Sequence, residues 1–167
     1  MTVLVAYGSK RGGTRGLAEM IGEGLRDEGF AVEVVPVGKA GAVDRYDAVI
    51  VGGALYAFRW HRGARRFVRS HAAQLRQRPT YLFSSGPLDD SASTRDIPPV
   101  KGVQALVDQV GARGHVTFGG RLAPDARGFP ASAMAKKNSG DWRDAGQVRS
   151  WVRSITPEIR AEAAQGV

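Results

Sequence analysis

The sequence contains no cysteine. Disulfide bonds, thiolate metal sites and cysteine nucleophiles are therefore excluded, and a reducing, cytoplasmic location is expected. It also lacks a run of about 18 apolar residues, which a membrane-spanning helix needs. Residues 2–7 are apolar, but no basic segment precedes them and no small-residue cleavage site follows. We interpret them as a buried strand rather than as a signal peptide.

Acidic residues are few and unevenly placed. The chain has 24 Lys and Arg against 16 Asp and Glu, a formal net charge of +8, and no acidic residue lies between Asp47 and Asp89. That interval contains the arginines Arg59, Arg62, Arg65, Arg66, Arg69, Arg76 and Arg78. A basic surface favours an acidic protein, nucleic acid, an anionic membrane or a carboxylated ligand. An arginine-rich composition can produce the same excess, so charge alone assigns no partner.

Short apolar runs alternate with helical patterns along the chain. Five runs are expected to be strands: residues 2–7, 31–37, 47–51, 80–83 and 115–118. After each of them except the second, apolar residues recur every three or four positions, which is typical of helices. The pattern predicts one domain over residues 1–167, with a parallel sheet of order 2-1-3-4-5 and helices on both faces. Its ligand crevice would lie outside the carboxyl ends of strands 1 and 3.

The loop after the first expected strand has the composition of an anion site. It reads Gly8-Ser9-Lys10-Arg11-Gly12-Gly13-Thr14 and leads into a helix. Backbone N–H groups, hydroxyls and the positive end of the helix dipole would all face a bound phosphate, and Lys10 and Arg11 add charge. The alternative is that Thr14 only caps the helix and the glycines form a turn.

Other phosphate-binding loops do not match. A Walker A loop needs lysine where Thr14 stands, and the G-x-G-x-x-G fingerprint of dinucleotide binding is absent. A receiver domain would have acidic residues at the ends of strands 1 and 3, which here read Tyr7-Gly8 and Gly52-Gly53. Elimination leaves a mononucleotide, and FMN is the usual one at this point of the sheet.

The segment after the third expected strand is rich in aromatic residues. It reads Gly52-Gly53-Ala54-Leu55-Tyr56-Ala57-Phe58-Arg59-Trp60-His61. An isoalloxazine ring needs an apolar platform, and each aromatic contact contributes roughly 0.5–1.5 kcal/mol. We expect ring contacts from Ala54, Leu55, Tyr56, Ala57, Phe58 and Trp60. The alternative is that Phe58 and Trp60 pack against the following helix.

Two further groups complete the expected site. The backbone of Ser84, Ser85 and Gly86, after the fourth strand, would meet the pyrimidine end of the ring. His61 is a candidate proton donor, although a histidine at this place can also cap a helix or lie at the surface, and the sequence assigns no other catalytic residue. The three histidines are scattered, so no metal site is expected.

These motifs resemble the flavodoxin superfamily and, within it, the group of the menaquinone-dependent protoporphyrinogen oxidases. The residues that carry the resemblance are Ser9, Gly12-Gly13-Thr14, Gly52-Gly53-Ala54-Leu55-Tyr56, Trp60-His61, Phe67-Val68 and Asp141-Trp142. The resemblance implies a flavodoxin-like, doubly wound, five-stranded parallel sheet that binds FMN.

Two departures from that family bear on function. Electron-transfer flavodoxins are acidic and cover the flavin with an aromatic residue after strand 4, whereas this chain is basic and has none there. One flavin face is therefore expected to be open to a substrate or a second cofactor. The oxidase group also has a longer insert after strand 5, associated with quinone or membrane contact, where this chain has only residues 121–140. Contact with a membrane surface stays open.

Three functions follow as alternatives. The first is an FMN oxidoreductase that acts on a small anionic, porphyrin-like or quinone-like substrate held by Arg59, Arg62 or Arg65. The second is an electron-transfer protein that docks an acidic redox partner protein. The third is a nucleic-acid-binding module without flavin. The chain has no motif that reads nucleic acid, so nucleic acid is not an expected partner.

Overall fold

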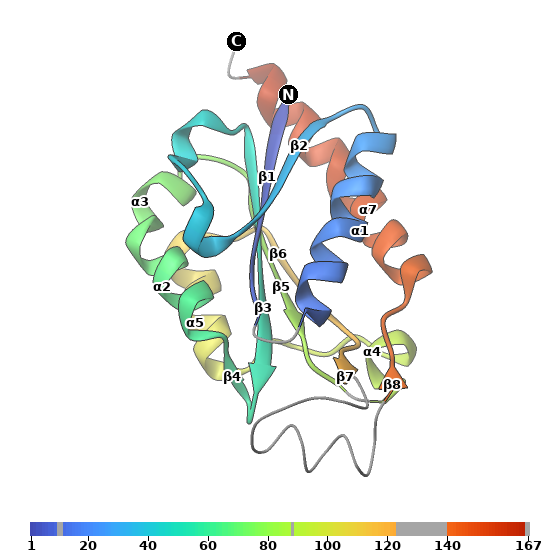
Figure 1. The fold of residues 1–167 in the computed structure, drawn as a ribbon. Coiled ribbons are helices and arrows are strands. Elements are labelled where there is room, and N and C mark those ends of the chain that lie inside the picture. Colours follow the sequence, from blue (N-terminus) through green and yellow to red (C-terminus); the bar gives the residue numbers. More distant parts are fainter. Residues whose placement is uncertain (10–11, 88, 123–139, 166–167) are drawn as a thin grey trace.

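The computed structural model of the protein describes residues 1–9, 12–87, 89–122 and 140–165, and a parallel β-sheet forms its centre. Its parallel strands are β1 (Thr2–Gly8), β2 (Ala31–Pro36), β3 (Ala48–Tyr56), β5 (Thr80–Ser85) and β6 (Gly114–Phe118). They are paired in the order β2-β1-β3-β5-β6 (Figure 1). A short strand, β4 (Arg59–Trp60), adds an antiparallel partner to β3. The predicted order of the five parallel strands is confirmed.

Helices cover both faces of this sheet (Figure 1). One layer is α1 (Gly13–Asp27) and α7 (Ala145–Gln165); the other is α2 (Arg62–Ser70), α3 (Ala72–Leu75) and α5 (Lys101–Val110). Successive residues of β1 point to opposite layers. Val3 and Val5 belong to the core under α1 and α7, and Leu4 and Ala6 to the core under α2 and α5. All four are 0% exposed, as expected for a parallel sheet buried on both faces.

Several short elements lie outside these layers. They are η1 (Val37–Lys39), η2 (Val43–Arg45), α4 (Ser91–Thr94), β7 (Arg121–Leu122) and β8 (Gly140–Asp141). The strands β7 and β8 pair with each other. In Figure 1 they lie near the carboxyl ends of the main strands, below the first turn of α1. They therefore stand on the edge of the sheet where a ligand is expected.

The third strand runs further than the sequence predicted. We expected it to end before Gly52-Gly53, but β3 continues to Tyr56. A Cβ atom on Gly52 would lie 1.9 Å from Cζ of Phe83, and one on Gly53 would lie 2.4 Å from Cε2 of Trp60. The two glycines do not end the strand. They leave space for two buried aromatic rings, and the expected loop is a hairpin instead.

The turn of this hairpin has a strained backbone. Ala57 and Phe58 connect β3 to β4, and both have positive φ angles, 48° and 64°. Two-residue turns of this kind match the twist of a hairpin but are normally formed by glycine or asparagine. Each non-glycine residue in this conformation costs about 1 kcal/mol. The turn holds Phe58 with 86% of its surface exposed.

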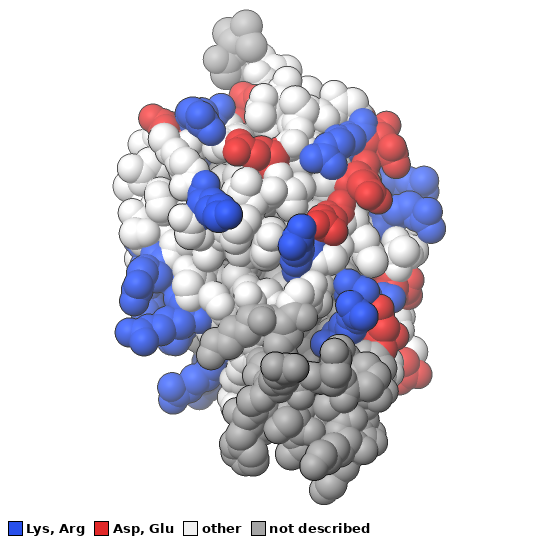
Figure 2. All heavy atoms as spheres, viewed as in Figure 1, with Lys and Arg blue, Asp and Glu red and all other residues white. Residues whose placement is uncertain are grey.

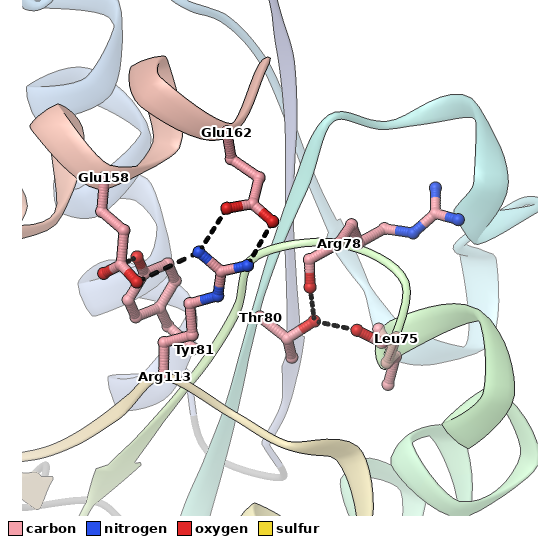
Figure 3. A network of polar contacts seen from close by, with 7 residues as sticks. All are labelled: Leu75, Arg78, Thr80, Tyr81, Arg113, Glu158 and Glu162. Carbon is pink, nitrogen blue, oxygen red and sulfur yellow. Dashed lines mark hydrogen bonds and ion pairs between the residues drawn. The ribbon is translucent and has the colours of Figure 1, made fainter. Parts of the chain in front are cut away.

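A polar network fixes α7 at the opposite, amino ends of the strands (Figure 3). The Tyr81 hydroxyl donates to Glu158 at 2.7 Å, and the Arg113 guanidinium donates to Glu158 at 3.1 Å and to Glu162 at 2.8 Å. Burial and the bond to Glu158 raise the pKa of Tyr81, and the bond to Arg113 lowers the pKa of Glu162. These contacts stabilise the fold away from the carboxyl edge.

Candidate functional site

The loop after β1 leads into α1 through a left-handed glycine. Gly12 is the N-cap at φ 81°, and its N–H donates to the Ser9 hydroxyl at 3.2 Å. Thr14 does not cap the helix; it is the second helical residue. Its hydroxyl is buried, with the residue 1% exposed, and has no hydrogen-bond partner among the described residues. An unpaired buried hydroxyl costs about 1–3 kcal/mol, so this position fits a ligand that accepts a hydrogen bond.

Positive charge surrounds the first turn of α1. That turn contains no acidic residue. A Cβ atom on Gly13 would lie 3.5 Å from Cβ of Arg121, and one on Gly16 would lie 2.0 Å from Nη1 of Arg143. The guanidinium of Arg143 and the backbone and Cβ atom of Arg121 therefore lie against the helix end. Sequence reasoning missed them because they are far from α1 along the chain and reach it only through the pairing of β7 with β8.

His61 is the N-cap of α2. Its Nδ1 accepts hydrogen bonds from the N–H groups of Gly63 and Ala64 at 3.1 and 3.3 Å. The ring also packs on the end of β1, because a Cβ atom on Gly8 would lie 2.4 Å from Nδ1. A nitrogen that accepts these bonds carries no proton, so a doubly protonated ring would break the cap. The structure shows the capping role; proton donation by His61 stays a prediction.

The hairpin residues have different surroundings. Trp60 is 2% exposed and packs in the core behind the hairpin, and its Nε1 has no partner within the described ranges. Phe58, in contrast, is exposed, and its ring projects into solvent. Leu55 meets the loop after β5, since a Cβ atom on Gly86 would lie 2.9 Å from its Cδ1. A flavin contact for Trp60 stays a prediction, but packing is the role seen here.

The end of β5 brings two predicted residues to the same edge. Ser84 and Ser85 were expected in a loop, but they lie in the strand and are 1% and 5% exposed. The Ser84 hydroxyl lies 2.8 Å from Nε2 of His115, so its side chain already has a partner. Burial lowers the pKa of His115 to about 4. Sequence reasoning did not find this pair because it depends on the register of β5 with β6.

The predicted substrate arginines gather beside the hairpin. Arg59 lies in β4, and Arg62 and Arg65 lie in the first turn and the following turn of α2. None of the three forms an ion pair within the described part of the chain. A hollow of about 500 Å³ on α2 is lined by Arg62, Arg65, Arg66, Arg69 and Ser70. Figure 2 shows basic side chains over this region with no acidic side chain among them in that view.

Some expectations fall outside the described residues or concern absent groups. Lys10 and Arg11, predicted as phosphate ligands, lie outside the described residues, as does most of the stretch 121–140. Across the ranges that the structure describes, no group of three or more His, Asp or Glu side chains is placed to hold a metal ion. None of the described helices is long and apolar enough to cross a membrane.

A family model described as a flavodoxin domain matches residues 4–131, well over half of the chain. The chain belongs to the flavodoxin-domain family. FMN is the cofactor of this flavodoxin domain, and it supports electron transfer. The unpartnered Thr14 hydroxyl beside a helix end without acidic residues fits the phosphate of FMN.

Individual relatives agree with this assignment. The protoporphyrinogen IX dehydrogenase [quinone] of Escherichia coli K12 is 26% identical over 86 residues, which are 50% of this chain and 48% of that protein. The same match is found in Escherichia coli O157:H7. The chain thus matches about half the length of these curated relatives.

Solved structures show the same fold. A flavodoxin from the domain Archaea superposes with a TM-score of 0.65 at 15% identity, covering 96% of this chain and 99% of the other. The rubredoxin oxygen:oxidoreductase of Desulfovibrio gigas gives a TM-score of 0.65 at 14% identity, covering 98% of this chain and 37% of the other. The second match places the fold within a larger protein.

Proposed function

We propose that this protein is an FMN-dependent oxidoreductase that acts on a small anionic substrate, which is porphyrin-like or quinone-like. We also propose that residues 1–167 form one domain. The observation that supports the proposed activity is the group Arg59, Arg62 and Arg65 beside the carboxyl end of β3, none of which forms an ion pair with another described residue. A guanidinium without an acidic partner binds carboxylates through two parallel hydrogen bonds. The similarity to protoporphyrinogen IX dehydrogenase supports the substrate class.

The cofactor would be held at the carboxyl edge by three segments. We assign the phosphate to Ser9, Gly12, Gly13 and Thr14, together with Lys10 and Arg11. The Thr14 hydroxyl would donate to a phosphate oxygen and regain the hydrogen bond that it lacks. The ring would lie among the hairpin residues Ala54, Leu55, Tyr56, Ala57 and Phe58 and the segment Ser84, Ser85 and Gly86. When bound, FMN supplies hydride or single-electron transfer.

The hairpin tip would supply the apolar platform. The backbone strain at Ala57 and Phe58 costs free energy without improving the packing of Phe58, which is 86% exposed. Strain of this kind is concentrated at functional sites. A flat ring stacked on Phe58 would bury it and offset part of that cost. Because Leu55 and Gly86 meet, the ring would rest on one continuous surface formed by the ends of β3 and β5.

The first experiment follows the absorption spectrum of the purified protein after FMN is added, excess FMN is removed, and the sample is reduced stepwise without oxygen. Retained flavin bands that bleach in a single step support two-electron chemistry and the proposed oxidoreductase. Bleaching in two resolved steps favours a one-electron carrier instead. Loss of all flavin during removal of the excess would contradict the site.

The arginines make a separate prediction. Replacing Arg62 or Arg65 by alanine should raise the KM for protoporphyrinogen IX about tenfold, since a charge-assisted hydrogen bond contributes about 1.5–3 kcal/mol. The kcat should change little because neither side chain is assigned a proton transfer. Steady-state kinetics with a quinone acceptor would measure this. Arg153→Ala, at an exposed position on α7, is the control. An unchanged KM in both α2 variants would refute the substrate role.

A second candidate function is an electron carrier that docks an acidic partner on α2. It is favoured by the row Arg62, Arg65, Arg66 and Arg69, which lines one hollow without an acidic residue. Docking of this kind is electrostatically steered, so the rate should fall steeply with salt. Reduction by an acidic ferredoxin at low and high ionic strength would distinguish the two functions. A rate independent of salt would exclude the carrier.

A further inference from the structure

We propose that Arg121 and Arg143 clamp the phosphate of the flavin against the first turn of α1, so that the site selects FMN over unphosphorylated riboflavin. The proposal rests on the flavin site argued above and adds two residues that neither the loop motif nor the family match assigns.

The β7–β8 pair is fixed in place by backbone contacts. Arg121 is paired with Asp141 across the two strands. The Trp142 N–H donates to the Gly120 carbonyl at 2.9 Å, and the Gly120 N–H donates to the Pro87 carbonyl at 2.9 Å. The chain is so close here that a Cβ atom on Gly119 would lie 2.0 Å from the Trp142 carbonyl oxygen. The position of Arg121 against Gly13 therefore follows from the fold.

Arg143 is held in a single orientation. Its Nε and Nη2 donate to the two oxygens of Asp141 at 2.8 and 2.7 Å, and its side chain is 14% exposed. These bonds lower the pKa of Asp141, which stays ionised. The remaining nitrogen, Nη1, makes no hydrogen bond within the described residues and lies against the backbone of Gly16. A donor is thus left unused at the helix end.

The charges at this end do not balance. The positive end of a helix dipole attracts anions and repels cations. Here the Arg143 guanidinium and the Cβ atom of Arg121 lie against it. Asp141 forms an ion pair with Arg143, and no ion pair of Arg121 is found among the described residues, so one positive charge remains. Arg15 in the same turn is already paired with Glu19 at 3.0 Å. A group with about two negative charges and several acceptor oxygens would offset this excess and reach the Thr14 hydroxyl.

The contact between Arg143 and α1 requires glycine at position 16. Because a Cβ atom on Gly16 would lie 2.0 Å from Nη1 of Arg143, only glycine lets the guanidinium approach the helix. Gly16→Ala would displace the guanidinium while keeping every charge in the chain. It is therefore a test of position, whereas Arg121→Gln and Arg143→Gln are tests of charge.

The experiment measures the Kd for FMN and for riboflavin by quenching of flavin fluorescence in the wild type and the three variants. We expect the FMN Kd to rise about tenfold in Arg121→Gln and in Arg143→Gln, and several-fold in Gly16→Ala, with the riboflavin Kd unchanged throughout. Wild-type FMN binding should also weaken with salt more than that of either Gln variant. Arg153→Gln, on the outer side of α7, should match the wild type.

The outcomes separate this proposal from the flavin site itself. Equal FMN affinities in the wild type and all variants would overturn the clamp and leave the flavin site standing. Equal losses for FMN and riboflavin would also overturn it, because they would show a general distortion of the site. If the wild type binds neither flavin, the flavin site fails and the clamp fails with it.

Discussion

Replacing Gly52 by alanine is expected to destabilise the protein by about 3 kcal/mol, the upper end of the usual cost of overpacking a core. The added Cβ atom would lie 1.9 Å from Cζ and 2.3 Å from Cε1 of Phe83. Phe83 is 0% exposed and cannot move outward, since its ring packs on Phe118 with centroids 6.0 Å apart. The strand or the ring must shift, and either change disturbs the core under α1 and α7.

Urea unfolding followed by circular dichroism would measure this loss. Gly102→Ala is the matched control, because a Cβ atom at that position in α5 meets nothing within 4 Å. In a helix this replacement should stabilise the protein by up to about 1 kcal/mol. Equal stability of Gly52→Ala and the wild type would show that β3 has room that the structure does not contain.

Lowering the pH from 7 to 5 is expected to cost about 2 kcal/mol of stability through His115 alone. Burial lowers the pKa of His115 to about 4 in the folded state, against an ordinary value of 6.5, although the charge of Asp96 acts in the opposite direction. Between these values the unfolded chain binds a proton that the folded chain does not. The stability is therefore fully present above pH 6.5 and is lost as the pH falls toward 4.

Comparison with His115→Gln isolates this contribution in urea titrations at pH 7 and pH 5. The variant should lose about 2 kcal/mol less than the wild type between the two values. Carboxylates with lowered pKa values, such as Asp89 and Asp141, lose their contribution only below about their ordinary value of 3.8. An identical pH dependence in His115→Gln and the wild type would refute the assignment.

The layers of the fold could be predicted because periodicity is a local property. The helical stripe that includes Leu17 and Ile21 and the apolar run of β1 are buried as expected. The hairpin after β3 could not be predicted in the same way. Two consecutive glycines, Gly52 and Gly53, are typical of the end of a strand. Only the positions of the Phe83 and Trp60 rings show that glycine is needed there to leave space for them.

The candidate site was predictable to the extent that it is formed by residues next to strand ends. The motif around Thr14 identified the helix end, but its free hydroxyl became visible only with the burial of the residue. Arg121 and Arg143 were invisible to the motif because their approach depends on pairing between distant segments. Trp60 was predicted as a flavin contact because it lies in the aromatic segment after β3, but its side chain is buried in the core.

The network of Tyr81, Arg113 and Glu158 has a practical consequence for protein engineering. It lies at the amino end of β5, and the ligand edge begins at the other end, separated by a strand of roughly 20 Å. Substitutions this far apart that share no partners add nearly independently. A variant in which this network is strengthened could therefore serve as a parent protein of higher folding stability. Costly changes at the binding edge could then be introduced and their affinities compared without loss of folded protein.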